Sequence, residues 1–164
     1  SKGHEPYSLA IMLEEMGLLN KSYIYATDFN ESILDEARNG LFSKEEYENS
    51  KKNYKKSGGL KVFDKWFDFQ DDFVQIKQKI MDKVLFFKHN LISDSSINEF
   101  HLILCRNVLI YFDDELQKRV FDIVDKSLFE DGFLILGESE LLNKQYKYKN
   151  IGNKKNKIYR KDYL

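Results

Sequence analysis

The sequence has a single cysteine, Cys105, and no long run of apolar residues. One thiol cannot form an internal disulfide and is typical of a reducing compartment. No apolar stretch approaches the roughly 18 residues that a membrane span needs. The charges nearly cancel, with 26 Lys and Arg against 27 Asp and Glu, so the chain as a whole has no pull toward nucleic acid or anionic lipid. We therefore predict a cytoplasmic protein that neither inserts into a membrane nor binds nucleic acid.

Several catalytic signatures are also missing. The sequence has no GxSxG elbow, no Walker loop and no full GxGxxG fingerprint. Its three histidines, His4, His89 and His101, lack the spacing of a zinc site, and Cys105 has no second cysteine to act with. We expect no metal, and we interpret His101 and Cys105 as packing residues of a buried strand.

Apolar residues make up 42% of the chain, which is enough for a core, and the length suits one domain. Apolar spacing, caps and turn residues predict the elements of the first half of the chain in this order: a helix opening at Glu5-Pro6 and ending at Gly17, a strand over 23–27, a short helix closed by Gly40, and a capping-box helix over 44–56. One or two short strands and a short helix are predicted within 60–83. They are followed by strands over 84–88 and 100–105, a helix after Asp113 or Asp114, a strand over 133–136 and a final antiparallel pair. Strands alternating with helices predict an α/β fold with a mostly parallel, doubly wound sheet.

Ligands of such sheets bind beyond the carboxyl ends of the strands. The polar residues just past the predicted strand ends are therefore site candidates: Asp28, Asn90, Arg106, Asn107 and Glu138. Asp28 follows Gly3 by 25 positions, close to the spacing at which an acid accepts the hydroxyl hydrogens of a ribose. The alternative is that Asp28 caps the next helix.

The other candidates also have two interpretations. Glu5 could bind an ammonium group, or it could simply interact with the positive end of its helix. Asn90, followed by Leu91, could pair with an adenine edge, and Arg106 beside Asn107 could bind a carboxylate. Each pair could equally cap its own loop.

Five segments in order resemble signature segments of the chemoreceptor methyltransferases, the CheR family: GHEPYSLA at 3–10, ATD at 26–28, HNL at 89–91, CRNVLIYF at 105–112 and LGESE at 136–140. The resemblance covers nearly the whole chain. It implies a class I methyltransferase (Rossmann-like) fold over 1–164, with an antiparallel C-terminal strand and a small antiparallel insertion at about 58–82. It also implies transfer of a methyl group from S-adenosylmethionine, leaving S-adenosylhomocysteine, to glutamate side chains of receptor helices.

The resemblance further implies roles for individual residues. The residues expected to contact the cofactor are Glu5, Asp28, Asn90, Leu91, Arg106 and Asn107. Asp28 would bind the ribose, and Asn90 and Leu91 would lie near the adenine. Tyr111 would be the catalytic residue at the methyl group; this role comes from the resemblance alone.

The sequence departs from the family in three places. His4 replaces a usual acid, which we expect to matter little. Residues 68–72, DFQDD, are acidic and lack the glycine that accompanies docking of a receptor's C-terminal pentapeptide in some members, which predicts a protein without that tether. A solvated turn over a small core is the alternative.

The third departure lies at the front. Family members carry a helical domain, a first strand and a glycine-containing turn before the segment that begins at Gly3. We therefore expect a truncated domain, with its first strand missing, that is marginally stable and inactive alone. A non-catalytic cofactor-binding or receptor-docking module is the competing interpretation. A methyltransferase for nucleic acid or a small molecule is disfavoured by the balanced charge and by residues 106–112.

Overall fold

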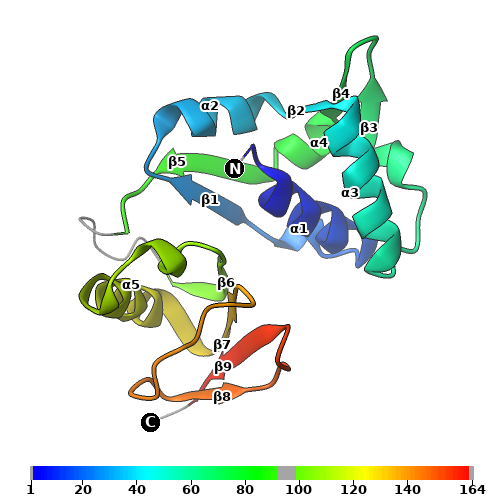
Figure 1. The fold of residues 1–164 in the computed structure, drawn as a ribbon. Helices are drawn as coiled ribbons and strands as arrows, with labels where there is room; N and C mark the ends of the chain where they lie inside the picture. Colours follow the sequence, from blue (N-terminus) through cyan, green and yellow to red (C-terminus); the bar gives the residue numbers. More distant parts are fainter. Residues whose placement is uncertain (1, 92–98, 163–164) are drawn as a thin grey trace. The chain divides into compact units, whose positions relative to one another are not determined.

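The computed structural model describes residues 2–91 and 99–162. The chain divides into two compact units, residues 1–89 and 90–164. Figure 1 shows the elements of both units. No helix of the described residues is long and apolar enough to cross a membrane.

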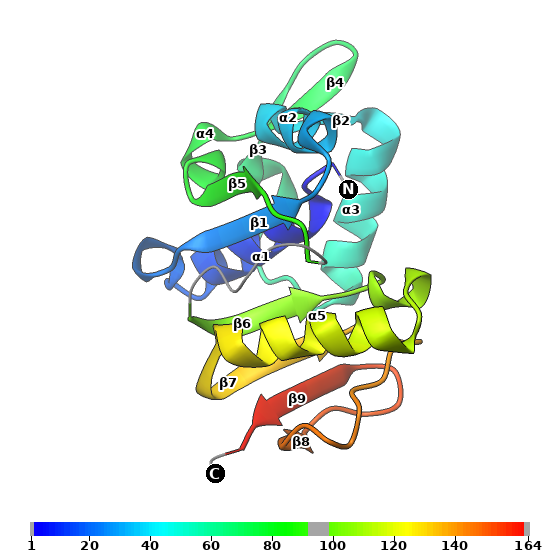
Figure 2. The same cartoon turned by 90° about the vertical axis from the view of Figure 1, so that its left-hand side faces the viewer.

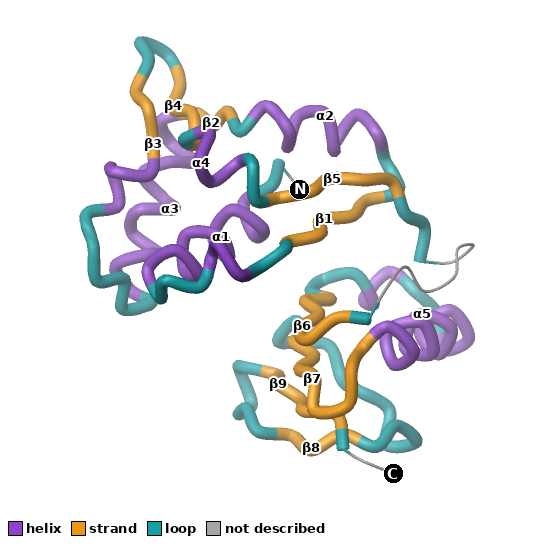
Figure 3. The backbone as a smooth tube through the Cα atoms, turned by 180° about the vertical axis from the view of Figure 1, so that it is seen from behind, coloured by secondary structure: helices purple, strands orange, loops and turns teal. Residues whose placement is uncertain are grey.

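The first unit combines a parallel strand pair with a small antiparallel sheet. Its elements are α1 (His4–Glu15), a 3-10 turn (Leu19–Lys21), β1 (Ile24–Asp28), α2 (Glu31–Asn39), β2 (Leu41–Ser43), α3 (Lys44–Lys56), a second 3-10 turn (Phe63–Trp66), β3 (Phe67–Phe69), β4 (Phe73–Ile76), α4 (Gln78–Met81) and β5 (Val84–Lys88). Strands β1 and β5 pair in parallel from Ile24 opposite Val84 to Asp28 opposite Lys88. The small sheet has the order β2-β4-β3, and α3 packs on β2 and β4 (Figure 3).

Local signals explain where the helices of this unit begin and end. Asn30 caps α2 by accepting the Ser32 N–H, and Gly40 closes that helix at φ 60°, a left-handed conformation that glycine adopts at little cost. Ser43 and Glu46 form the predicted capping box of α3. These bonds fix both ends of the segment that links β1 to the small sheet.

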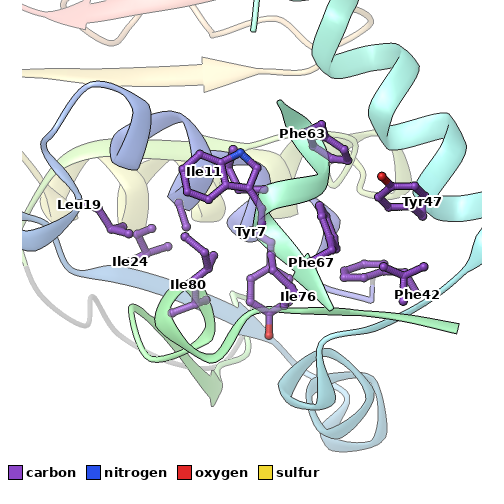
Figure 4. Close-up of a cluster of buried hydrophobic side chains, with 14 residues drawn as sticks. Tyr7, Ile11, Leu19, Ile24, Phe42, Tyr47, Phe63, Phe67, Ile76 and Ile80 are labelled. Atoms are coloured by element: carbon purple, nitrogen blue, oxygen red, sulfur yellow. The ribbon is translucent and has the colours of Figure 1, made fainter. Parts of the chain in front are cut away.

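The core of the first unit is rich in aromatic side chains (Figure 4). Tyr7 of α1 packs edge-on against Phe42, and Phe42 in turn packs against Phe67. Such tilted and edge-to-face pairs are favoured by the ring quadrupoles. The cluster therefore joins α1 to the small antiparallel sheet.

The second unit is a four-stranded sheet with one long helix. Its elements are β6 (Phe100–Cys105), a 3-10 turn (Leu109–Tyr111), α5 (Asp114–Ser127), β7 (Leu128–Leu136), β8 (Tyr148–Asn150) and β9 (Lys157–Lys161). The strand order is β6-β7-β9-β8, with β6 parallel to β7 and β9 antiparallel to it. Figure 2 shows α5 along β6 and β7, and its apolar residues Val120, Phe121 and Val124 share a core with Leu134.

Most predicted elements are present, with two differences. Residues 41–43 form β2, a strand that the sequence did not reveal and that pairs with β4. Strand β7 starts at Leu128 and not at Phe133, because Asp131, at φ 63°, lies inside the strand, and the pairing with β6 shifts register there. In the described residues β1 pairs with β5 alone and β6 with β7 alone, so each ends its sheet. The expectation of a missing first strand stays a prediction.

Candidate functional site

The first unit places Asp28 at the carboxyl end of β1. The backbone N–H of His89 donates to the Asp28 carbonyl at 3.0 Å, so the segment after β5 begins beside Asp28. The Asp28 carboxylate Oδ1 accepts the Asn30 N–H at 2.9 Å, which forms a tight turn. The cap of α2 is Asn30, so the alternative role of Asp28 as that helix cap is wrong.

Glu5 lies in the first turn of α1, where backbone N–H groups lack partners within the helix. The residue before the helix, Gly3, is left-handed at φ 84° and gives the turn no side-chain cap. An ideal Cβ on Gly3 would stand 2.8 Å from the Tyr7 ring, so this position requires glycine. The result is a positively polarised helix end with an acid on it.

A buried hydrogen bond fixes α1 against the end of α2. The Tyr7 hydroxyl donates to the Ala37 carbonyl at 2.7 Å, and the Tyr7 side chain is almost fully buried. Burial raises the pKa of Tyr7 to about 12, so the phenol remains a donor at physiological pH. The bond thereby holds α1, the helix that carries Glu5, against the end of α2, the helix that follows Asp28.

The second unit carries the remaining predicted residues. Leu91 is partly buried against its core, directly after Asn90. Arg106 and Asn107 come directly after β6, and both are exposed. Tyr111 ends the 3-10 turn that follows and is 80% exposed. The loop from Arg106 to Phe112 therefore presents three of the predicted residues on one short segment.

This loop is held from inside by a carboxylate that the sequence did not single out for a role. Glu140 is 3% exposed, and its two oxygens accept four backbone N–H groups. Oε1 accepts those of Val108 and Leu109, both at 2.8 Å, while Oε2 accepts that of Asn107 at 3.0 Å. The fourth donor is the N–H of Gly137, 2.6 Å from Oε2.

The far end of the loop is held by Gln117 of α5. Its side-chain amide donates to the carbonyl of Leu109 at 3.1 Å and to that of Phe112 at 2.9 Å. Glu138, the candidate two residues past the end of β7, is exposed, whereas Glu140 two residues later is buried. The strand-end rule therefore selected Glu138, two positions before the acid that holds the loop.

Within residues 2–91 and 99–162, no group of three or more His, Cys, Asp and Glu side chains is placed to hold a metal ion. Cys105 is buried at the end of β6, as a packing thiol would be.

Comparison with known proteins identifies the class. The family model "CheR methyltransferase, SAM binding domain" matches residues 1–158. The chain therefore belongs to this family, and its α/β fold with parallel strands is that of the class I methyltransferases. The family domain binds S-adenosylmethionine.

Individual relatives agree with the family match. The Cher3 protein of Pseudomonas putida is 40% identical over 140 residues, which cover 85% of this chain and 51% of Cher3. The chemotaxis protein methyltransferase of Borreliella burgdorferi is 35% identical over 157 residues, 90% of this chain and 53% of that protein. That of Escherichia coli is 31% identical, over 85% of this chain and 49% of its own length. The chain spans about half the length of these relatives.

Proposed function

We propose that the protein transfers the methyl group of S-adenosylmethionine to glutamate side chains of chemoreceptors. Relatives named chemotaxis protein methyltransferase support this proposal. The observation that carries it is the placement of Asp28 at the end of β1 and of Arg106 and Asn107 directly after β6. Strand carboxyl ends are where α/β sheets bind nucleotides and their relatives.

The side chains fit the cofactor's chemical groups. S-adenosylmethionine carries an ammonium, a carboxylate, a ribose diol and an adenine. Carboxylates such as Glu5 and Asp28 suit the ammonium and the diol, and the Arg106 guanidinium suits the carboxylate. We assign Asn90 and Leu91 to the adenine.

The reaction asks little acid–base chemistry of the protein. A glutamate side chain has a pKa of about 4.3, so near neutral pH it is already a nucleophilic carboxylate. When bound, the cofactor supplies a methyl activated by its sulfonium: the carbon–sulfur bond breaks, its electron pair stays on sulfur, and a carboxylate oxygen bonds to the methyl carbon, giving S-adenosylhomocysteine. No proton moves, so the protein's task is to orient the reactants and to exclude water. We assign orientation at the methyl group to Tyr111.

Calorimetric titration with S-adenosylhomocysteine tests the cofactor assignment. We would compare Asp28→Asn with Asp71→Asn, an exposed acid of the β3–β4 turn, both in the 164-residue chain and in the product of its complete gene. Hydrogen bonds to a charged group contribute about 1.5–3 kcal/mol, so we expect Asp28→Asn to weaken binding by roughly 10- to 100-fold. Asp71→Asn should leave binding unchanged. Equal affinities for the two variants would refute the role of Asp28.

Methyl transfer to receptor fragments tests the substrate. Transfer of labelled methyl groups to base-stable sites, or to RNA, would contradict receptor glutamates as the acceptor. Binding without any transfer would favour the non-catalytic module. Because residues 68–72 are acidic and free of glycine, we propose that the protein does not use a receptor's C-terminal pentapeptide. Receptors with and without that peptide should therefore be methylated at equal rates.

A further inference from the structure

The loop after β6 has the backbone geometry of an anion-binding nest. Asn107 is left-handed at φ 57°, and Val108 follows in the right-handed region at φ −111° and ψ −46°. A left-handed residue next to a right-handed one points successive N–H groups toward one concave spot, which binds anions. Here the N–H groups of residues 107–109 converge on a carboxylate of the same chain, that of Glu140.

We propose that Glu140 is a positioning residue for methyl transfer. Its carboxylate fixes the loop that carries Arg106, Asn107 and Tyr111. The inference rests on the proposed function, because that function gives those three residues their roles. Glu140 itself is buried and touches neither cofactor nor substrate in this assignment, so it acts through the loop.

The geometry shows why a carboxylate is needed at this point. A left-handed conformation is unfavourable for a residue with a Cβ, even though asparagine tolerates it better than most. The hydrogen bonds that the backbone N–H groups donate to Glu140 offset the cost of the left-handed conformation. The four donors require four acceptor positions on two oxygens. A carboxylate supplies all four, whereas a glutamine amide has one accepting oxygen and an NH2 group that would face two N–H donors.

Gly137 brings the carboxylate close enough. An ideal Cβ at this position would lie 2.5 Å from Asn107 Oδ1 and 2.7 Å from Glu140 Oε2. The Asn107 side chain therefore rests against the glycine, on the turn that the Glu140 N–H closes by donating to the Gly137 carbonyl at 3.0 Å. The orientation of Asn107 is thus set by its own backbone bond to Glu140 and by contact with Gly137.

Loss of this support should displace Tyr111 more than it weakens general folding. Tyr111 lies four residues after Asn107 in the same loop, at the end of its 3-10 turn, and its side chain is exposed. A misplacement of about 1 Å at a reacting centre can cost on the order of 100-fold in rate. The effect should therefore appear mainly in kcat, with a smaller change in the receptor KM.

The test compares Glu140→Gln and Glu140→Asp with Val120→Ala in the product of the complete gene. Val120 is fully buried in the same core as Leu109 of the loop, and its apolar side chain makes no hydrogen bond, so its truncation lowers stability and leaves the bonds to Glu140 in place. We expect Glu140→Gln to lower kcat by about 30- to 100-fold and to weaken S-adenosylhomocysteine binding about tenfold, with the receptor KM within about threefold. Glu140→Asp, which keeps the charge on a shorter side chain, should recover part of both. Val120→Ala should keep kcat and affinity within about threefold below its unfolding temperature.

The outcomes separate this inference from the proposed function. Glu140→Gln with kcat and affinity within about threefold of the wild type would overturn the inference, as would an equal loss in Val120→Ala. A wild-type protein that binds S-adenosylhomocysteine but methylates no receptor would refute the substrate alone. The change in affinity would then decide for or against Glu140. A wild type that binds no S-adenosylhomocysteine would overturn both.

Discussion

Replacing Gly40 with alanine should destabilise the first unit through two separable effects. Gly40 ends α2 in the left-handed region at φ 60°, which disfavours any residue with a Cβ. It is also buried: an ideal Cβ there would meet Ile76 Cγ2 at 2.7 Å and Met81 Sδ at 3.0 Å. Gly17, just after α1, is left-handed as well, at φ 71°, but has nothing within 4 Å of its Cβ position. The two glycines therefore differ in packing and share the backbone cost.

The magnitudes follow from these contacts. The left-handed conformation costs an alanine about 1–2 kcal/mol at either position. At Gly40 the Cβ adds about 1–3 kcal/mol of overpacking, because Ile76 is 1% exposed and cannot move away, although Met81 can adjust. We expect about 2–5 kcal/mol for Gly40→Ala and about 1–2 kcal/mol for Gly17→Ala. Any change in unfolded-chain entropy is common to both and cancels in the difference.

Urea unfolding followed by tryptophan fluorescence measures this difference. Trp66 is the chain's one tryptophan, is 6% exposed and shares a core cluster with Ile76. With an m-value of about 1–3 kcal/mol per M, a difference of about 2 kcal/mol moves the midpoint by roughly 1 M. Equal midpoints for Gly40→Ala and Gly17→Ala would refute the close packing around Gly40. A midpoint unchanged from wild type in both would refute the left-handed conformations.

Two further predictions concern the same unit. Tyr7→Phe removes the hydroxyl that donates to the Ala37 carbonyl, but that carbonyl keeps the Gly40 N–H as a donor. We therefore expect the free energy of unfolding, measured with urea, to fall by about 1 kcal/mol. A fall of several kcal/mol would contradict the remaining bond. The Lys51 ammonium beside Asp64 holds the pKa of that carboxyl below its usual value, so the pair stabilises the fold above the usual pKa of about 3.9 and loses this effect as pH falls through the lower folded value. Asp64→Asn should therefore lower the urea midpoint at pH 7 and approach the wild type at acid pH, and a gap that widens on acidification would contradict the pairing.

Much of the fold could be predicted because its signals are local. The capping box of α3, the glycine after α2 and the continuous apolar runs of β5 and β6 each lie within a few residues of the element they define. Strand β2 could not be found in this way. Its three residues become a strand only through pairing with β4, about thirty positions away, and such pairing depends on backbone groups that every residue has.

The same reason explains the extended β7. Asp131-Gly132 is a typical turn sequence, and Asp131 does take a left-handed conformation. The turn sits inside the strand, however, because β6 pairs with residues on both sides of it, Leu128 before and Phe133 after. The turn sequence therefore agrees with the conformation of Asp131, but the strand boundary predicted at Phe133 is wrong.

The site shows a different limit of prediction from sequence. The strand-end rule selected Asp28, Arg106 and Asn107 as candidates because it asks which side chains follow a strand, and the structure places them at strand ends. That rule does not select Glu140, because its partners are backbone N–H groups, which every residue except proline has and which the sequence therefore does not distinguish. Its neighbour Glu138 has the same chemistry and is exposed.

What distinguishes the two acids is the conformation of a residue more than thirty positions away. The left-handed conformation of Asn107 points the N–H groups of the loop toward the interior, where they need an acceptor. The buried carboxylate of Glu140 needs hydrogen-bond donors in turn. Each condition supports the other, and neither is visible alone. Removing the charge at Glu140 should therefore free the Asn107 turn, whereas removing the charge at Glu138 should leave it in place. Hydrogen exchange of the Val108 and Leu109 amides in the two glutamine variants would separate these cases, and equal protection in both would mean that the turn holds without its carboxylate.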